Sequence, residues 1–359
     1  MNRPSRRDGR WTTTETRLFR EFFGTSERVV ELVWELVVRD ELRPRGGRPE
    51  HLLWALHFLK VYPKQGPGCA VVGASNGAVD AKTHRKWVWA FVDAIAELVD
   101  VVVSTFFRKN TRNVRAPWSG RKLSTQIFGL NGWCPSSQSF SVVYLCAFFQ
   151  WSHRASSHHP SPPPCHRPSP PQIDFENRKK GDVHNDCLMT IDGTDFQIPQ
   201  QGTATRGNAF ASHKYAGKSA LRYELGVSIL GGDLVWIQGP YPAGEYPDVK
   251  IFNKVLRHFL DPGERVEADE GYAGHADKVK CPANPCNPPE NLAMQGRVRS
   301  RHETLNGRLK NWGILRQVYR HDILRHGDVF RACAVLTQLA IDEGDRLFEV
   351  EYGDNIEAL

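Results

Sequence analysis

The amphipathic pattern of residues 26–103 predicts a small helical domain. Its clearest helix opens at Arg48-Pro49-Glu50, with proline near the first helical position and an acid in the first turn. The apolar run of residues 51–59 continues that helix. A second helix is predicted to start near Asp80, because large apolar residues recur at spacings of 4, 4 and 3 in Trp87, Phe91, Ile95 and Leu98.

Basic side chains at the head of this second helix indicate contact with DNA. Lys82, Arg85 and Lys86 lie on its other faces, as in a helix-turn-helix domain that presents its last helix to a duplex. A plain three-helix packing module is an equal alternative, because the turn lacks a decisive signature. Residues 1–25, rich in arginine and polar residues, are predicted to form a loose basic arm.

Residues 174–353 alternate between strand and helix patterns, which predicts an α/β fold. Three apolar stretches are predicted as an antiparallel meander, with Gly231-Gly232-Asp233 as the last turn. These strands cover residues 187–191, 221–230 and 234–237. A helix at 248–256, a short strand at 265–268 and helices at 300–312 and 329–341 complete the unit. We expect a mixed sheet flanked by helices, preceded by the small helical domain.

Residues 104–173 differ in composition from the rest of the chain. They hold nine of the 23 prolines and twelve serines but no Asp or Glu, and no helical or strand period persists in them. A structureless loop of this length inside a compact domain is improbable, so the segment is predicted to be an insert, disordered or derived from an unspliced intron. A basic DNA-contacting linker or a His/Cys metal patch is the functional alternative. Sequencing the mature transcript decides whether these codons persist.

The charge of the whole chain gives no argument for a nucleic-acid partner. The formal charge is +7, but eight of the 47 Lys and Arg lie in residues 104–173. The remaining chain has 39 basic residues against 40 acidic ones, so it is close to neutral. The longest apolar run, residues 139–151, is shorter than the roughly 20 residues that a membrane span needs, and we expect no membrane partner. Eight scattered cysteines favour reduced thiols inside a cell.

Three acidic residues are predicted to lie at the ends of regular elements. Asp192 follows the first strand, Asp269 follows the strand at 265–268, and Glu303 lies on the next helix. Strand ends and a neighbouring helix can bring such residues to one edge of a sheet. Three carboxylates suit Mg²⁺ or Mn²⁺, and two such ions about 4 Å apart promote attack of water on a phosphodiester.

Each of these residues has another interpretation. Asp192-Gly193 is a common turn opener, Asp195 competes with Asp192 as a ligand, and Asp269 could belong to a plain loop. Glu303 fits a capping box in which Ser300 is the N-cap residue. Replacing Glu303 with Gln separates the two roles, since a capping box accepts Gln whereas a metal site loses an anionic ligand.

The helix that carries Glu303 also carries a basic patch. Glu303, Asn306 and Lys310 share the side away from its apolar stripe, as expected of a metal site that meets a phosphate. Residues 297–331 contain nine basic and three acidic side chains, a local net charge of +6. This patch is predicted to face DNA, with a solvated charged face as the alternative. The residues assigned to DNA from this helix are Arg299, Arg301, Arg308 and Lys310.

Taken together, these motifs resemble the DDE superfamily endonucleases of the PIF/Harbinger transposase type. The resemblance covers residues 174–353 and the helical region 48–100, and it rests on the stretches 191–196, 221–224, 236–244, 264–272 and 299–307. It implies an RNase H-like fold with Asp192, Asp269 and Glu303 as the metal ligands in that order. The interval of 34 residues from Asp269 to Glu303 is similar to that of the superfamily. The insert departs from the pattern but interrupts none of the motifs.

The resemblance implies a nuclear, Mg²⁺- or Mn²⁺-dependent transposase that cleaves DNA at transposon ends and joins the 3′-OH to target DNA. It also implies a Myb-like accessory protein as partner, and a homodimer is compatible with it. Three alternatives remain open. The chain could be a domesticated nuclear DNA-binding derivative that no longer cuts, a host nuclease of the same fold, or a non-functional product of the insert.

Overall fold

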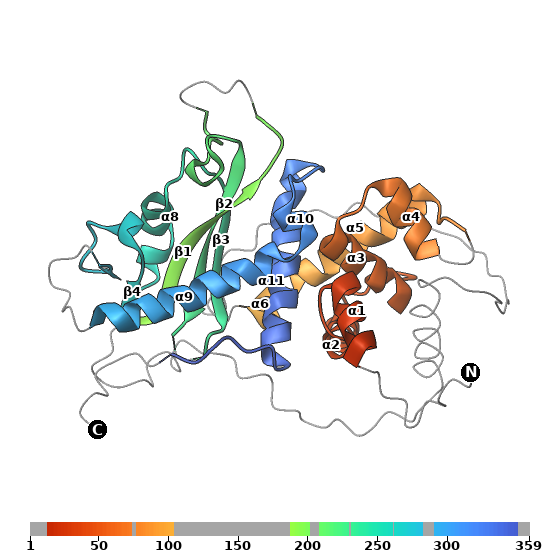
Figure 1. The fold of residues 1–359 in the computed structure, drawn as a ribbon, viewed down its shortest axis with the longest axis horizontal. Helices are drawn as coiled ribbons and strands as arrows, with labels where there is room; N and C mark the ends of the chain where they lie inside the picture. Colours follow the sequence, from red (N-terminus) through yellow and green to blue (C-terminus); the bar gives the residue numbers. More distant parts are fainter. Residues whose placement is uncertain are drawn as a thin grey trace.

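The computed structural model describes residues 13–73, 77–103, 187–201, 208–229, 231–260, 262–282 and 291–350. Within these ranges the chain forms a helical unit and an α/β unit that lie side by side (Figure 1). The predicted insert at 104–173 lies outside the described residues, so its prediction stays untested.

The helical unit contains the two helices that the sequence pattern predicts. They are α3 (Pro49–Val61), which begins at its proline, and α5 (Ala81–Glu97). Asp80 caps α5, because its side chain accepts a hydrogen bond of 2.9 Å from the amide of Thr83. The other helices here are α1 (Thr13–Phe23), α2 (Glu27–Arg39), α4 (Gln65–Gly73) and α6 (Val99–Val102).

The predicted loose arm is wrong for residues 13–23. They form α1, which packs against α3 through Phe19, a side chain only 4% exposed. Aromatic residues spaced along one side of α1 give it an apolar face, and tertiary packing of that face stabilises the helix. The basic composition of the segment by itself does not predict it. Residues 1–12 lie outside the described ranges.

Helix α5 belongs to the helical unit and packs against the α/β unit. It contacts α3 on one side and α11 (His326–Asp342) on the other, and Phe91, Val92 and Ile95 are fully buried there. The predicted apolar stripe of this helix is therefore buried, as both a helix-turn-helix domain and a plain packing module require, and the choice between them stays a prediction. Lys82, Arg85 and Lys86 are exposed at its N-terminal end, and their role in binding DNA stays a prediction.

The α/β unit is built on a five-stranded mixed sheet. Its strand order is β3-β2-β1-β4-β5: β2 is antiparallel to both β1 and β3, whereas β4 is parallel to β1 and β5 is parallel to β4. The predicted meander is thus confirmed, and β5 is an addition. The strands are β1 (Cys187–Gln197), β2 (Ala220–Ser228), β3 (Leu234–Pro242), β4 (Arg265–Glu267) and β5 (Val279–Lys280).

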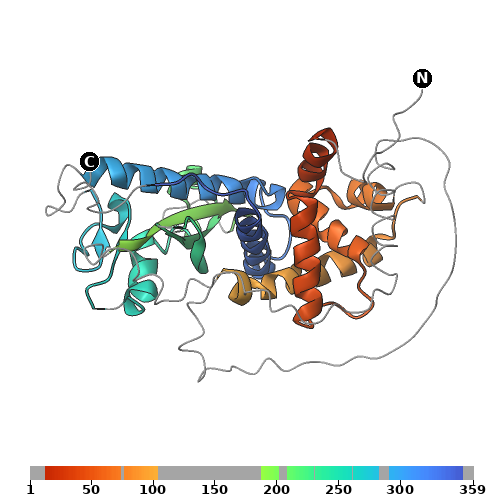
Figure 2. The same ribbon diagram turned by 90° about the horizontal axis from the view of Figure 1, so that it is seen from below.

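Helices cover both faces of this sheet (Figure 2). Residues of even number in β1 face α9 (Asn291–Lys310) and α11: Thr190 bonds to His302, and the Phe196 ring lies 5.3 Å from that of Phe330. Residues of odd number face α8 (Asp248–Lys254), where Ile191 packs in a cluster with Phe252. Because β1 is buried on both faces, its side chains alternate between two different environments. Among the described residues, no helix is long and apolar enough to cross a membrane.

A carboxyl group is buried on the α8 side of the sheet. Glu224 is fully inaccessible and accepts a hydrogen bond of 3.0 Å from Trp236 Nε1. Tyr272 donates a longer bond of 3.4 Å to its other oxygen. Burial raises the pKa of Glu224 to about 8, although the two hydrogen bonds oppose this shift. Glu224 is therefore protonated in the folded protein at neutral pH.

The raised pKa predicts that Glu224→Gln stabilises the fold increasingly as the pH rises. The unfolded wild type ionises above its normal pKa, whereas the folded chain holds the proton up to about pH 8. Wild-type stability is therefore lost between about pH 5 and 8, and the neutral amide avoids that loss. We expect the variant to gain at least about 2 kcal/mol relative to wild type between pH 5 and 8 in urea unfolding. A difference independent of pH contradicts the assignment.

Candidate functional site

Asp192 lies inside β1 and not after its end. The strand continues to Gln197, and Asp192 pairs with Leu225 of β2. The interpretation of Asp192-Gly193 as a turn opener is therefore wrong. Pairing with a long β2 carries the strand through the polar residues, because backbone hydrogen bonding across a sheet does not depend on the side chain.

The parallel register of β1 and β4 brings Asp192 and Asp269 together. Thr190 pairs with Glu267, the last residue of β4, and Asp192 and Asp269 each follow two positions later, so Asp269 lies just beyond the end of β4 at the level of Asp192. Asp269 then caps a short 3₁₀ helix through a bond of 2.9 Å from the amide of Gly271. Burial raises the pKa of Asp192, and the charge of Asp269 adds to that rise, while Lys214 opposes it. The two carboxylates are thus close enough to repel each other.

Helix α9 is fixed over this edge by two polar contacts. His302 Nδ1 and Thr190 Oγ1 are 2.8 Å apart, and Asn306 Nδ2 donates a bond of 2.8 Å to Asp192 Oδ2. The pKa of the fully buried His302 is lowered by burial to about 3, so its ring is neutral. Asn306 Oδ1 is buried and has no hydrogen-bond partner. An orphaned carbonyl oxygen therefore lies beside Asp192.

Glu303 lies on α9 between these two contacts, but its side chain is exposed. No ionic or hydrogen-bond contact joins it to Asp192 or Asp269 within the described residues. The capping-box interpretation is wrong, because α9 begins at Asn291 and Ser300 is in its interior, donating to Gly296 O at 3.0 Å. The structure thus brings two of the three predicted ligands together and leaves the third on the adjoining helical turn.

Asp195, the competitor of Asp192, is held in a buried ion pair on the α8 side of the sheet. Arg222 binds it with two bonds of 2.7 and 3.0 Å, and Ser212 donates a third of 2.5 Å. Burial opposes ionisation, but these bonds lower the pKa of Asp195. Both of its oxygens are occupied, whereas Asp192 accepts a single side-chain bond from Asn306. Asp192 is therefore the freer ligand.

Arg222 also contacts a third aspartate that the sequence pattern did not single out. Asp248, the first residue of α8, lies 3.2 Å from Arg222 Nη1. Burial raises its pKa to about 6, with Asp192 and Asp195 adding to the rise and Arg222 opposing it. Its position at a predicted helix start was the available signal, but nothing in the sequence indicated that α8 reaches the edge where Asp192 lies.

Two lysines provide positive charge around Asp192. Lys214, in a 3₁₀ turn formed by His213–Tyr215, donates a hydrogen bond to Gly193 O. Burial lowers the pKa of Lys310 at the end of α9, and Lys214 lowers it further while Asp192 opposes this. Lys310 was predicted from its helix face. Lys214 was missed, because residues 202–219 show no periodic pattern that would place them at the site.

Two of the arginines predicted to bind DNA have structural roles. Arg301 is 2% exposed and donates to the carbonyl oxygens of Ser228 and Ile229 at the end of β2. Arg308 donates to the carbonyl oxygens of Asp345 and Arg346, which holds the chain after α11. The assignment of Arg301 is wrong, because its buried guanidinium satisfies carbonyl groups at the end of β2. Arg308 is only partly buried, so its contact with DNA stays a prediction. Arg299 remains partly exposed.

The donor set at this edge is made of oxygen atoms. Asp192 and Asp269 supply carboxylates, and Asn306 supplies the unpartnered carbonyl oxygen. Hard divalent cations such as Mg²⁺ prefer these ligands, so the residues fit such an ion. Within the described ranges, however, no group of three His, Cys, Asp or Glu side chains is arranged as a metal site. The four cysteines in those ranges are buried.

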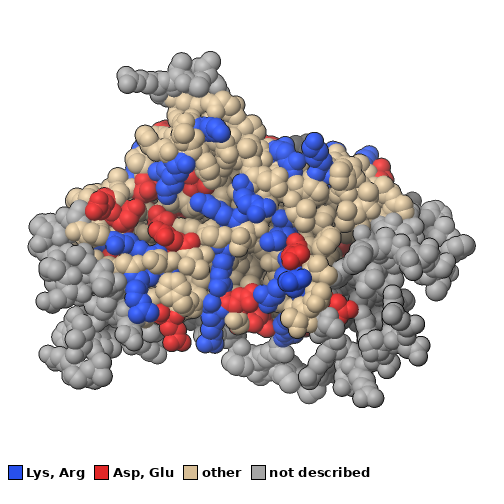
Figure 3. Space-filling view, viewed as in Figure 1, with Lys and Arg blue, Asp and Glu red and all other residues tan. Residues whose placement is uncertain are grey.

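The surface around this edge is divided by charge. On the face seen in Figure 3, acidic side chains gather where Figure 1 draws α8 and β4, and basic ones lie beside them toward α10 (Gly313–Arg316). An acidic centre next to a cationic surface suits a phosphate that must be both held and attacked.

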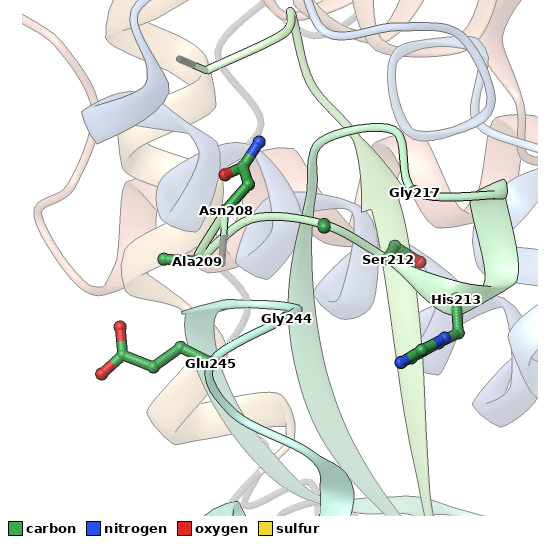
Figure 4. Close-up of a pocket in the computed structure, with 8 residues that line it drawn as sticks. Asn208, Ala209, Ser212, His213, Gly217, Gly244 and Glu245 are labelled. Carbon is green, nitrogen blue, oxygen red and sulfur yellow. The ribbon is translucent and has the colours of Figure 1, made fainter. Parts of the chain in front are cut away.

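A separate pocket of about 440 Å³ lies near this region. In Figure 4, Asn208, Ser212 and His213 come from one segment, and Gly244 and Glu245 come from the loop that faces it. Ser212 connects the pocket to the Asp195 ion pair. None of the three predicted carboxylates lines the pocket.

Close packing of α8 on β1 predicts that Gly193→Ala destabilises the site. A Cβ at this position would lie 1.8 Å from Asp248 Oδ1, so α8 or Asp248 must shift. We expect a loss of about 1–3 kcal/mol in chemical denaturation. In combination with Asp248→Ala, which removes the obstructing carboxylate, the loss should be smaller than the sum of the two single variants.

Gly307→Ala in α9 is the matched control. A Cβ there meets no atom within 4 Å, so alanine should stabilise the helix by roughly 0.5–1 kcal/mol. Equal effects at the two glycines, or additive behaviour of Gly193→Ala with Asp248→Ala, contradict the predicted contact.

Comparison with known proteins places no further constraint on this site. No family model, curated protein or solved structure matches the chain.

Proposed function

We propose that the chain is a metal-dependent DNA endonuclease of RNase H-like fold that acts as a DDE-type transposase. The strand order β3-β2-β1-β4-β5, with an antiparallel meander followed by two parallel strands, supports this fold. The helices on both faces of the sheet are compatible with it. The proposed substrate is the phosphodiester backbone of transposon ends, and the proposed location is the nucleus.

One observation carries the proposal. Asp192 in β1 and Asp269 just beyond the end of the parallel strand β4 lie close enough to repel each other, and Asn306 of α9 donates a hydrogen bond to Asp192. Two carboxylates placed in this way are the minimum for binding a divalent ion that must also contact a phosphate oxygen.

The residues of the chain take distinct parts in this reaction. Asp192 and Asp269 hold the ion, and Asn306 orients Asp192 by its hydrogen bond of 2.8 Å. A bound Mg²⁺ or Mn²⁺ supplies an activated water and neutralises charge on the leaving oxygen. Lys310 places a cation on the DNA side of the carboxylates, where the substrate phosphate must lie.

Glu303 is the proposed third ligand. It lies three residues before Asn306, one helical turn along the side of α9 that approaches β1. Its exposed side chain has three rotatable bonds and can turn toward the carboxylate pair when an ion is present. Joining of the cut 3′-OH to target DNA remains part of the proposal on the strength of the resemblance alone.

The exposed position of Glu303 favours a second candidate function, that of a DNA-binding protein without cleavage activity. A domesticated DNA-binding protein that no longer cuts needs no third ligand near Asp192 and Asp269, and no contact joins Glu303 to them here. A Myb-like accessory protein and a homodimer are proposed partners for either function.

Cleavage of supercoiled plasmid in Mg²⁺ or Mn²⁺ tests the proposal. We expect wild-type protein to nick the plasmid and EDTA to stop it. Asp192→Asn, Asp269→Asn and Glu303→Gln should each reduce nicking to background, because each removes an anionic ligand. Asn306→Ala removes an orienting partner only, so a smaller loss of roughly 10–100-fold is expected.

Asp277→Asn is the control, since Asp277 is exposed and pairs with Arg257 away from the proposed ligands. It should nick as the wild type does. DNA binding without nicking in any metal supports the domesticated alternative. Full activity in Glu303→Gln, with loss in the two aspartate variants, would remove Glu303 from the proposed site.

A further inference from the structure

The junction between the two units carries four basic residues that three different elements bring together. Lys60 lies in the last turn of α3, and Arg85 lies near the start of α5. Arg316 is the last residue of α10, and Arg320 follows that helix. We name this group, Lys60, Arg85, Arg316 and Arg320, the cationic seam. Arg85, Arg316 and Arg320 are exposed, and Lys60 is partly exposed.

Backbone contacts hold the seam in place. Lys60 Nζ donates to Asn311 O at 3.1 Å, and Gln317 Nε2 donates to Val61 O at 3.3 Å. The guanidinium of Arg320 stacks 4.0 Å from the centre of the Tyr62 ring and donates to Tyr62 O. The charges of Lys60 and Arg320 are therefore oriented before any partner arrives, which reduces the entropy lost on binding.

The members of the seam repel one another. Burial lowers the pKa of Lys60, and the charge of Arg316 lowers it further, with Glu21 opposing. Burial also lowers the pKa of His321, and both Arg320 and Arg85 add to that change. These effects place Arg316 near Lys60, and Arg320 and Arg85 both near His321. Tyr62, which holds Arg320, follows Lys60 by two residues, so the two pairs adjoin at the end of α3.

The seam differs in its lack of ion pairs from Arg28 and Arg39, two arginines of the helical unit. Arg28 pairs with Glu31 at 3.3 Å and Arg39 pairs with Asp40 at 2.7 Å. In the part of the chain that the structure describes, none of the four seam residues forms an ion pair with a carboxylate. Neighbouring cations that are not neutralised by an ion pair favour an anionic partner.

We propose that the cationic seam binds the sugar–phosphate backbone of duplex DNA without reading its sequence. The inference rests on the proposed function and extends it, because the seam adjoins the end of α9 that carries Lys310 and leads away from Asp192. Asn311, which follows α9, contacts Lys60 directly. A duplex with one phosphate at the carboxylates can therefore continue across the junction to the basic head of α5, and the helical unit anchors the DNA that the α/β unit cuts.

Salt dependence of DNA binding tests the seam. Binding of the full chain to a fluorescent duplex of arbitrary sequence is measured in EDTA over a range of NaCl concentrations. The double variant Lys60→Gln/Arg316→Gln should make the slope of log K against log salt less steep by about 2, since each lost phosphate contact changes it by roughly 0.9. The change should be the same for unrelated sequences. Lys60→Arg/Arg316→Lys keeps both charges and should preserve the slope.

The matched control is Arg28→Gln/Arg39→Gln, which removes the same number of positive charges from arginines that have acidic partners. Its slope should equal that of wild type. If the slope changes equally in the two neutralised double variants, the proposal for the seam is contradicted, because the loss of net charge then explains the effect. Tighter binding of single-stranded RNA than of duplex DNA, or no binding at low salt, overturns it as well. Matching unfolding midpoints verify that each variant is folded.

The use of EDTA separates this inference from the proposed function. If wild type nicks DNA and the seam variant binds with an unchanged slope, the seam is wrong and the endonuclease stands. In the opposite case, the wild type never nicks DNA, but the seam variant has a less steep salt dependence of binding than the wild type. The endonuclease proposal is then wrong, and the proposal for the seam stands.

Discussion

The burial of β1 on both faces is the constraint on which this architecture depends. A central strand covered by α9 and α11 on one side and by α8 on the other must place alternate side chains in two dry environments. Asp192 and Asp195 occupy opposite faces, and a buried carboxylate without partners costs several kcal/mol. Each therefore has a hydrogen-bond donor from a neighbouring element, Asn306 for Asp192 and Arg222 for Asp195.

The two carboxylates are satisfied in different ways, and this difference separates structure from candidate chemistry. Asp195 receives three bonds from Arg222 and Ser212, so it stabilises the junction of β1, β2 and the following segment. Asp192 receives one side-chain bond from Asn306 and repels Asp269. Incomplete satisfaction with like-charge repulsion is typical of sites that await a cation.

The helical unit shares a hydrophobic core with the α/β unit. Helix α5 packs on α11, and one continuous apolar cluster runs from Val33 and Leu56 to Leu339. Such a shared core fixes the angle between the two units. The basic surface at their junction is consequently rigid, and a duplex that touches both units meets charges at fixed spacing.

Sequence alone determined the elements whose signals are local. Helices α3 and α5 follow from their apolar spacing and from Pro49 and Asp80, and the meander follows from apolar runs separated by glycines. It also singled out Asp192 and Asp269, since each adjoins an apolar strand. Tertiary structure decided the rest: the extension of β1 through Asp192, the level register with Asp269, the start of α9 ahead of Ser300, and the burial of Arg301. Lys214, Asp248 and the cationic seam belong to the same group. All of these depend on pairing and packing between residues far apart in the chain, and no local periodicity encodes such contacts.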